Sequence, residues 1–523
     1  MTARRGLRTA AAASLLAALV AGCSGGGGRP VDVGGGAASS GGAQGGGSQG
    51  GGTLTAALSG EPDQLDPHKT SAYQSFQVLE NVYDTLVQPG AAPSLTMEPA
   101  LAERWQTSPD GRTWTFTLRQ GVRFHNGNPF AADDVVYSYR RIIDEKLSNA
   151  YRFAAVKSVT AKDPQTVVLT LTRPAPNLLE QIGGFKGMAI LDKETGSSTD
   201  LRRAANGTGP FKLANYRAGN AIELVRNDTY WGGRTKLDGV TFRFVKDPTV
   251  ALTDLQSGQV QWTDNLPPQQ VASLQSGGGL TLGRTPSTDY WYFAANQRRK
   301  PFDDVRVRQA LAFAIDREAV VQAATFGAAT VNQTAIPRGD EYFVDHAPYR
   351  RDVARARELL AQAGRPDLRL QLMVTDEYPQ TVQAAQVMVS QFKEAGITAE
   401  IRSLDFASWL DNQTKGDFDV LALGWLGNLD PDDFYYAQHH SKGTFNAQKY
   451  ANPEVDRLLD AGRSELDPAR RKGLYDQAVR RIVDDASYVY LYNPEVVQGW
   501  KGLQGYVPRP DRAVRFKDVS RTA

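Results

Sequence analysis

An alternation of strand and helix patterns in the second half of the chain constrains its fold more than any other feature. Apolar residues recur at every second position in the segments expected to be strands, and at helical spacing in the segments between them. The strands are expected at 368–374, 397–401 and 419–423, and the helices at 305–315, 352–363, 381–395 and 408–415. Strands separated by helices pair in parallel, with the helices covering the sheet faces. The sequence therefore predicts an α/β fold in this region.

The first half of the chain is richer in strand patterns. Residues 114–118 alternate large apolar residues with threonines, and the turn at 120–121 leads into 122–124, so we expect a hairpin there. A helix is expected at 132–142 and a further strand at 167–171. We find no repeat of fixed period and no second low-complexity linker, so ordered crossings should join the domains.

The predicted parallel sheet has a consequence for function. In open α/β sheets, ligands bind beyond the carboxyl ends of the strands. Here those ends lie at 375–378, 405–406 and 424–430. The last segment combines two glycines, which allow close backbone approach, with Trp425 for stacking and with Asn428 and Asp430 for polar contacts. The alternative interpretation is a tight loop with a core tryptophan and a turn aspartate before proline.

The N-terminus has the pattern of an export signal. Three arginines in the first eight residues precede the apolar run 10–21, which is shorter than the about 20 residues that a membrane span needs. The run ends in Val-Ala-Gly-Cys, which resembles the bacterial lipobox, where the cysteine becomes the lipid-modified first residue of the mature protein. We expect residues 1–22 to be a lipoprotein signal peptide and Cys23 to be lipidated. A plain signal peptide with an incidental cysteine is the alternative, and the choice between Sec and twin-arginine export stays open.

The rest of the composition points to a globular body outside the membrane. Residues 23–52 are about half glycine and predict a flexible tether, and the folded body should begin near Thr53. No other apolar run is long enough to cross a bilayer. Cys23 is the single cysteine, which excludes an internal disulfide. Lys+Arg 59 nearly balance Asp+Glu 57, so the chain lacks the basic character typical of nucleic-acid-binding domains.

Several blocks of the sequence resemble one family. The strongest runs from Ala102 to Arg141 and contains SPDGRTWTFTLRQGVRFHNGNPFAADDVVYSYRR. Further blocks are Gly207-Thr-Gly-Pro-Phe211, Asn227 to Trp231, Leu255 to Gly258, NQRRKPFDDVRVRQALAFAIDREAV from Asn296 to Val320, and Asn452-Pro453. In these blocks the body resembles the extracellular solute-binding proteins of ABC importers. The resemblance is to the branch with dipeptide-, oligopeptide-, nickel- and oligosaccharide-binding members. The resemblance covers most of the chain from Thr53 onward.

The resemblance implies a periplasmic-binding-protein-like α/β fold of type II, with two lobes, an extra subdomain in lobe I, and a ligand cleft between the lobes. Mapped onto this chain, lobe I is expected at 53–83, 201–289 and 485–523, the subdomain at 84–200, and lobe II at 290–484. The crossings between the lobes would lie near 290–296 and 487–493. The lobes are expected to close over the ligand by hinge motion.

The resemblance also bears on the ligand-binding residues. In peptide-binding members, an aspartate three residues after the tryptophan of the Gly-Trp pair holds the ligand's α-amino group, and Asn428 stands there. An amide does not neutralise a buried ammonium, which makes a peptide with a free N-terminus a poorer fit unless Asp430 takes over. Phe406 falls where oligopeptide binders have an aromatic wall residue. Tyr290 and Tyr292 should add aromatic surface near a crossing, with core packing as the alternative.

The remaining expectations concern partners and rival functions. Tyr73 is a candidate contact from lobe I. His439-His440 is the single histidine pair, and we expect a solvated surface pair rather than a metal site. We find no His-Glu-x-x-His, Gly-x-Ser-x-Gly or Walker pattern, so we expect neither catalysis nor a cofactor. The chain should be a monomeric, lipid-anchored binding protein that meets ABC permease subunits at the extracytoplasmic face. A secreted hydrolase, including a glycosidase carboxylate pair, and a ligand-sensing lipoprotein are the alternatives.

Overall fold

The computed structural model describes residues 51–92, 94–184, 188–274, 280–426 and 429–522. The expected signal peptide, Cys23 and the tether up to residue 50 lie outside this range, as does Asn428. Among the described residues, none of the helices has the length and apolar character needed to cross a membrane.

The parallel unit predicted in the second half is confirmed. In chain order it comprises β15 (Arg369–Thr375), α10 (Pro379–Glu394), β16 (Thr398–Leu404), α11 (Phe406–Lys415) and β17 (Val420–Trp425). Strand β15 pairs in parallel with both β16 and β17. The predicted helix before it is α9 (Val353–Gln362), which begins because the Asp352 carboxylate accepts a hydrogen bond from the Arg355 amide. The carboxyl ends of the three strands therefore share one edge, as the sequence predicted.

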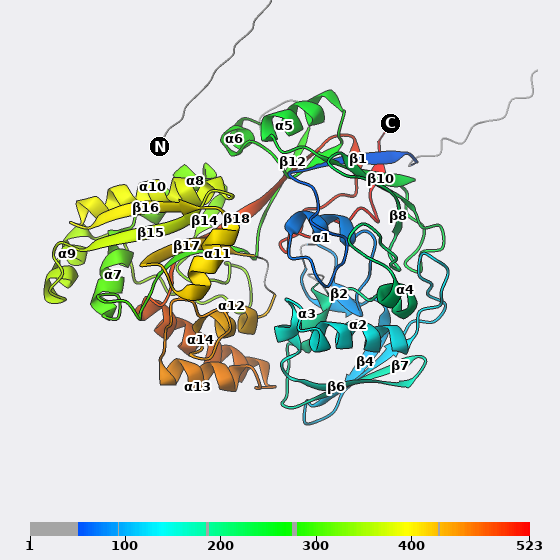
Figure 1. Cartoon of the computed structure of the whole chain (residues 1–523), viewed down its shortest axis with the longest axis horizontal. Helices are drawn as coiled ribbons and strands as arrows, with labels where there is room; N and C mark the ends of the chain where they lie inside the picture. The colour runs from blue at the N-terminus through cyan, green and yellow to red at the C-terminus, as the bar shows by residue number, and fades with distance from the viewer. Residues whose placement is uncertain (1–50, 93, 185–187, 275–279, 427–428, 523) are drawn as a thin grey trace, which may run out of the picture. The chain divides into compact units, whose positions relative to one another are not determined.

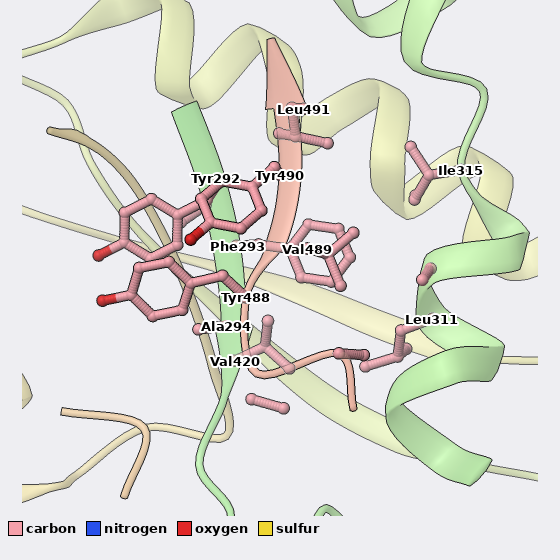
Figure 2. Close-up of a cluster of buried hydrophobic side chains, with 14 of the residues drawn as sticks. Tyr292, Phe293, Ala294, Leu311, Ile315, Val420, Tyr488, Val489, Tyr490 and Leu491 are labelled. Atoms are coloured by element: carbon pink, nitrogen blue, oxygen red, sulfur yellow. The ribbon is translucent and has the colours of Figure 1, made fainter. Parts of the chain in front are cut away.

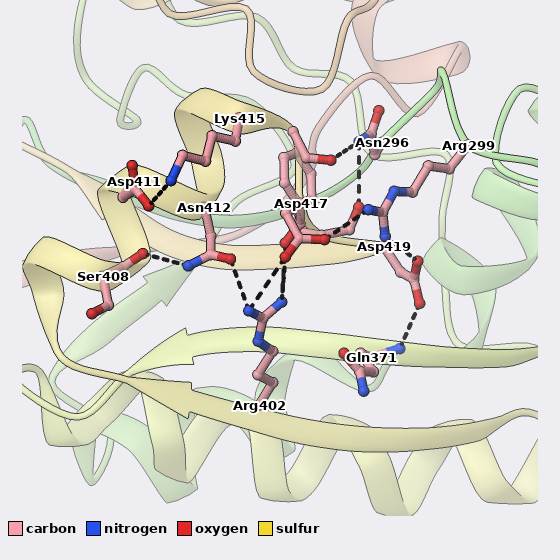
Figure 3. Close-up of polar contacts among 12 residues, drawn as sticks. Asn296, Arg299, Gln371, Arg402, Ser408, Asp411, Asn412, Lys415, Asp417 and Asp419 are labelled. Atoms are coloured by element: carbon pink, nitrogen blue, oxygen red, sulfur yellow. Dashed lines mark hydrogen bonds and ion pairs between the residues drawn. The ribbon is translucent and has the colours of Figure 1, made fainter.

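A polar cluster fixes the opposite, amino end of β17 (Figure 3). Asp417 accepts hydrogen bonds from Arg299 at 2.8 Å and from Arg402 at 3.1 Å through its backbone oxygen. Asp419 accepts from the backbone amide of Gln371 at 3.0 Å and from Arg299 at 3.1 Å. These contacts tie the start of β17 to its neighbours and thereby fix the position of the strand in the sheet.

Two antiparallel strands extend this sheet. Strand β13 (Tyr290–Ala295) pairs with β17 on one side and with β18 (Val489–Trp500) on the other. The first half of β18 also pairs with β14 (Ala329–Val331), whereas its second half pairs with β12 (Thr281–Pro286) and β11 (Trp262–Thr263). Strand β18 thus belongs to both halves of one sheet, and Figure 1 shows it crossing between them.

Lobe I contains the other half of that sheet. Within the described residues the sheet has 12 strands, and its path runs β16-β15-β17-β13-β18-β11-β1-β10-β9-β8. The lobe I strands not yet given are β1 (Thr53–Leu58), β10 (Gly239–Phe244), β9 (Ala221–Arg226) and β8 (Phe211–Arg217). Its helices are α1 (Tyr73–Leu79), α5 (Pro248–Ser257) and α6 (Val271–Leu274), and η2 (Pro268–Gln270) is a 3-10 turn. Trp262, Phe242 and Phe516 pack at its core with the buried C-terminal segment.

The polypeptide between the two halves of the sheet is held by side-chain hydrogen bonds. The Asn493 amide donates to the carbonyl oxygens of Asp289 and Ala335, both at 2.8 Å. The Ser287 hydroxyl donates to the carbonyl oxygen of Pro494 at 2.7 Å. Residues 287–289, which connect β12 to β13, are therefore fastened to β18 at the point where that strand changes partners.

The subdomain has a four-stranded antiparallel sheet in the order β4-β5-β7-β6. Its strands are β4 (Ala102–Thr107), β5 (Thr113–Leu118), β7 (Thr166–Leu171) and β6 (Val156–Asp163), with the small pair β2 (Val87–Pro89) and β3 (Met97–Pro99). Its helices are α2 (Ala132–Asp144), α3 (Leu178–Gly183) and α4 (Lys193–Ser198), with the 3-10 turn η1 (Ala150–Phe153). The helix and the strand that the sequence predicted here, α2 and β7, are both confirmed.

The hairpin predicted between 114–118 and 122–124 is wrong. Strand β5 pairs with β4 and β7, so both of its edges are occupied. Arg123 instead forms an isolated bridge with Pro129, because the Asn126-Gly127 turn folds the chain back on itself. The predicted pairing was across the turn at 120–121, whereas the chain folds back at Asn126-Gly127.

Five further helices complete lobe II. They are α7 (Val305–Ala314), α8 (Arg317–Thr325), α12 (Pro431–His439), α13 (Pro453–Gly462) and α14 (Pro468–Asp484). Figure 1 shows α12, α13 and α14 together, on the side of lobe II toward the subdomain strands β4, β6 and β7. The short pair β19 (Leu503–Gln504) and β20 (Ser520–Arg521) lies near the C-terminus.

Candidate functional site

Aromatic side chains gather at the carboxyl ends of the lobe II strands. Tyr378 precedes α10 and is 36% exposed. Its ring lies 5.7 Å from that of the half-buried Phe406, which in turn stacks on the buried Trp409 at 6.2 Å. The Asp405 carboxylate caps α11 and thereby fixes the position of Phe406 at the first residue of that helix. Phe406 therefore belongs to a partly open aromatic surface, of which Tyr378 was not singled out from the sequence.

Trp425 ends β17 at the same edge of the sheet. It is half-buried, and its ring meets that of Phe445 edge-on at 5.0 Å. Gly424 is required beside it, because a Cβ there would lie 2.7 Å from the indole of Trp291. Leu426, the next residue, is 44% exposed. The strand thus presents one large aromatic and one exposed aliphatic side chain where ligand contacts were expected.

Asp430 is directed toward the protein. Its carboxylate accepts hydrogen bonds from both terminal nitrogens of Arg471, at 2.8 and 2.9 Å. It also caps α12 by accepting from the Asp432 amide at 2.9 Å, and it accepts from the Asn177 amide at 3.1 Å. Both oxygens of this buried carboxylate are therefore engaged, and a ligand ammonium would have to compete with Arg471.

Tyr290 and Tyr292 lie within the core of lobe II. Tyr292 is 2% exposed and stacks on Tyr488 with ring centroids 3.8 Å apart, as Figure 2 shows. Tyr290 is 1% exposed, and its ring lies 5.5 Å from that of Tyr490. Burial raises the pKa of Tyr292 to about 12. Both side chains occupy the packing position that the sequence left open as the alternative.

Lobe I contributes Tyr73 together with an arginine that sequence reasoning missed. The Tyr73 hydroxyl donates to the carbonyl oxygen of Arg512 at 3.2 Å, and the Arg512 guanidinium lies 4.3 Å from the centre of the tyrosine ring. Arg512 also pairs with Asp289 at 3.0 Å. Its side chain remains 32% exposed, and its backbone has φ of 63°. No spacing or motif in the C-terminal segment marked this arginine as a site residue.

The charge of Arg512 reaches the aromatic surface of lobe II. Burial raises the pKa of Tyr378, the neighbouring Glu377 raises it further, and the Arg512 guanidinium opposes the rise. Arg512 also pairs with Asp289, which directly precedes Tyr290, the partner of Trp425 in the β13–β17 pairing. Tyr73 and Arg512 of lobe I therefore lie toward the end of β17 that carries Trp425. Such an arrangement offers aromatic faces for stacking and a partly exposed cation with donors for a polar group.

The expectation that His439 and His440 form a solvated surface pair is wrong. His439 is fully buried, with Nδ1 2.9 Å from the Ser487 hydroxyl and Nε2 2.8 Å from the Tyr490 hydroxyl. His440 is 4% exposed and stacks on Tyr436 at 4.5 Å. Burial lowers the pKa of His439 to about 3, so this ring is neutral at physiological pH.

Helix α12 is covered by the start of β18 and by α13, which buries both histidines. The described part of the chain contains no group of three or more residues suited to hold a metal ion. His125 is likewise structural, with Nε2 3.0 Å from the carbonyl oxygen of Gly209.

Comparison with known proteins agrees with this architecture. The sequence model of the bacterial extracellular solute-binding proteins, family 5 Middle, matches residues 96–446. The probable di/tripeptide-binding protein 5 of Pseudomonas aeruginosa (strain UCBPP-PA14) is 28% identical over 501 residues, which cover 90% of this chain and 95% of that protein.

Two solved structures extend the comparison. The ABC transporter-associated periplasmic binding protein DppA from Helicobacter pylori, in complex with the peptide STSA, has a TM-score of 0.81 at 27% identity, covering 91% of this chain and 99% of that chain. AgaA from A. tumefaciens R10, in complex with agropinic acid, has a TM-score of 0.80 at 28% identity, covering 90% and 99%. The expected two-lobed α/β fold is thereby confirmed. The chain belongs to the bacterial extracellular solute-binding proteins of family 5.

Proposed function

We propose that this protein captures a small solute between its two lobes and delivers it to the permease of an ABC importer. The observation that carries the proposal is the aromatic surface at the carboxyl ends of the lobe II strands, toward which Tyr73 and Arg512 of lobe I are brought. Closure of the lobes buries the solute, and the contacts available only in the closed form shift the population toward it. The chain performs no catalysis in this scheme.

The proposed boundaries of the lobes and the subdomain are placed by which strands belong to which sheet. Lobe I takes 53–83, 201–289 and 485–523, the subdomain takes 84–200, and lobe II takes 290–484. The separate four-stranded sheet at β4–β7 supports the subdomain, and the partner change of β18 near Asn493 lies at the end of the proposed crossing at 487–493. The protein acts as a monomer with one ligand cleft.

The solute is a peptide-like molecule or an oligosaccharide with an apolar or stackable face. Tyr378, Phe406 and Trp425 supply stacking surfaces, and Arg512 supplies hydrogen-bond donors. Asp430 is paired with Arg471, so a free ligand ammonium is not the group that this site recognises best. The relatives bind different solutes by their descriptions, with a peptide in one structure and agropinic acid in another.

A thermal-shift screen tests this function. The library contains di- to octapeptides, capped peptides, oligosaccharides, opines and metal chelates, because a ligand that binds only the native state raises the melting temperature. We expect hits among the capped peptides or the sugars. Replacing Trp425 by alanine should weaken binding of each hit by about tenfold or more, since a buried aromatic contact is worth on the order of 1–3 kcal/mol.

The matched control is Trp105→Ala, a half-buried tryptophan on β4 of the subdomain. This variant should keep every hit at the wild-type affinity. Turnover of a peptide or glycoside by the purified protein would contradict the proposal and favour a secreted hydrolase. Binding without any permease partner in the cell would favour a sensor lipoprotein.

We also propose that Cys23 anchors the protein to the outer face of the cell membrane. Residues 1–22 act as the signal peptide and residues 23–52 act as the tether, as their composition supports. In the native host, Cys23→Ala should move the protein from the membrane fraction to the soluble fraction. A Ser24→Ala variant, which keeps the cysteine, should stay with the membrane; equal partition of the two variants would contradict lipidation at Cys23.

A further inference from the structure

The subdomain and lobe II meet at a polar junction. The Asn177 amide, at the start of α3, donates to Asp430 at 3.1 Å, and the Gln181 amide donates to Asp433 at 2.7 Å. Arg173 donates to the carbonyl oxygen of Arg463 at 2.8 Å. These contacts join segments about 250 residues or more apart in the chain. They exist only while the subdomain and lobe II touch, so they belong to the closed arrangement of the lobes.

The lobe II side of the junction is strongly acidic. Asp430, Asp432 and Asp433 stand at the start of α12, and each is less than 10% exposed. Arginines compensate them: Arg471 pairs with Asp430 at 2.8 Å and Arg463 pairs with Asp432 at 3.1 Å. Arg152 of η1, on the subdomain side, lies 3.7 Å from Asp433. Arg471, Arg463 and Arg152 are thus each paired with one of the three aspartates.

Glu180 of α3 adds a fourth carboxyl group from the subdomain side. It lies three residues after Asn177, about one helical turn away, and directly before Gln181, and those two residues contact lobe II. Its Oε2 atom is buried and has no hydrogen-bond partner among the described residues. Glu180 as a whole is half-buried, but an ionised carboxylate with one oxygen buried and unpaired is costly, whereas the protonated carboxyl group is far less so.

The charged groups around Glu180 add to the cost of ionising its carboxyl group, apart from Arg471, which reduces it. Burial raises the pKa of Glu180 to about 7, and the negative charge of Asp430 raises it as well. Arg471 of α14 opposes the rise, and Asp433 of α12 adds to it. Asp432, in the first turn of α12, is also buried, and burial raises its pKa to about 6. The balance at the junction therefore favours a neutral Glu180 while the two sides are in contact.

We propose that closure of the lobes is coupled to the uptake of one proton by Glu180. When the subdomain and lobe II part, water and solvent screening return to the carboxyl group, which ionises and releases the proton to the solvent. When they meet again, the side chain takes a proton from the solvent and enters the junction neutral. The inference rests on the hinge closure that the proposed function requires, but it holds for any solute that the closed form retains.

The direction of the pH effect follows from this coupling. Glu180 binds more protons in the closed form than in the open form between its ordinary pKa of about 4.5 and about 7. Closing is therefore favoured as the pH falls through this window and disfavoured as it rises. With these two values, the ratio of closed to open molecules falls about 30-fold between about pH 5.5 and about pH 8.5.

Distance measurements between two labels test the coupling. Cysteines replace Lys162 at the end of β6 and Arg457 on α13, both exposed, in the full chain carrying Cys23→Ala so that no other thiol is present. Spin labels at the two sites report the closed and open populations at each pH without added solute. We expect the wild-type ratio to fall with rising pH, and the Glu180→Gln variant to stay closed at both pH values.

The matched control is Glu103→Gln, an exposed glutamate on β4 of the same subdomain. It should keep the wild-type pH profile. An unchanged ratio in the wild type, or a Glu180→Gln variant that still follows pH like the wild type, would overturn the proposal.

If the spin-label distances show only closed or only open molecules at both pH values, a disulfide-trapping experiment detects the rarer form. A Cβ at Gly184 would lie 3.1 Å from Cδ1 of Leu429, so cysteines at these two positions come within reach of each other only when the junction is closed. At about pH 8.5 the pair should be trapped at least about tenfold faster in the Glu180→Gln background than in the Glu180 background. Equal rates would contradict the coupling. A pH-dependent junction in a protein that binds no solute would instead refute the proposed function and leave the coupling intact.

Discussion

Replacing Arg471 by methionine is expected to lower the free energy of unfolding by about 3–5 kcal/mol. Arg471 is 5% exposed and makes two hydrogen bonds to Asp430, at 2.8 and 2.9 Å. It also donates to the carbonyl oxygen of Gly462 at 3.1 Å and lies over the ring of Tyr475 at 5.2 Å. Methionine fills part of the volume but leaves the Asp430 carboxylate buried without its cation. Chemical unfolding at neutral pH, followed by circular dichroism, measures the loss.

The neighbouring residue provides the control. Arg470 has an exposed side chain, 72% accessible, and pairs with Glu465 at 3.1 Å. Arg470→Met should change the free energy of unfolding by no more than about 1 kcal/mol, because exposed ion pairs contribute little. Equal effects of the two substitutions would show that the Arg471–Asp430 pair does not hold α12 to α14 as described.

Arg141→Met should cost a similar amount at the boundary between lobe I and the subdomain. Arg141 of α2 donates to both oxygens of Asp66, at 2.6 and 3.0 Å, and lies 3.1 Å from Nδ1 of His68. Both Arg141 and Asp66 are less than 10% exposed, so removing the arginine leaves an unpaired buried carboxylate. We expect a loss of about 3–5 kcal/mol in the free energy of unfolding at neutral pH.

The pH dependence of this deficit distinguishes lost charge pairing from lost packing. Burial raises the pKa of Asp66, but the hydrogen bonds and charge of Arg141 lower it below its ordinary value of 3.8. Asp66 therefore stabilises the wild-type fold above that value, and this contribution disappears as the pH falls through the lowered pKa. In Arg141→Met, protonated Asp66 needs no cation, so the deficit should shrink in acid.

The control for Arg141 is its exposed neighbour. Arg140 is 64% accessible and lies 3.8 Å from Asp144. Arg140→Met should leave stability within about 1 kcal/mol of the wild type at every pH. A deficit in Arg141→Met that stays constant down to acid pH would assign the effect to packing instead of the charge pair.

Local patterns predicted those elements whose signals lie within one segment. The strands and helices between Asp352 and Trp425 were predictable because period-two and helical spacings, helix-capping aspartates and terminal glycines all agree there. The edge of the sheet where Phe406 and Trp425 lie followed from that order alone. The burial of Tyr290 and Tyr292 did not follow, since all six residues of β13 are buried and a short apolar run does not say what will cover its two faces.

Features that depend on contacts between distant segments could not be predicted from the sequence. Tyr292 is buried because Tyr488, just before β18, stacks on it. His439 is buried because Ser487 of the same connection and Tyr490 of β18 contact its ring. Arg512 becomes part of the candidate site only through contacts with Tyr73 and Asp289. None of these partners lies near enough in the sequence to leave a periodic signal, so a single sequence offers no warning of them.

The strand shared by the two lobes also sets the order in which the protein can be made. Strand β18 is one of the last segments to be synthesised, yet it lies between β13 and β11 in the interior of the sheet. Neither half of the sheet can complete its hydrogen bonding until about residue 500 is available, and such distant pairing makes folding slow. A nascent chain therefore stays incompletely folded until synthesis is nearly finished, and the edge of the sheet that carries the candidate site is assembled only once β18 has joined the two halves.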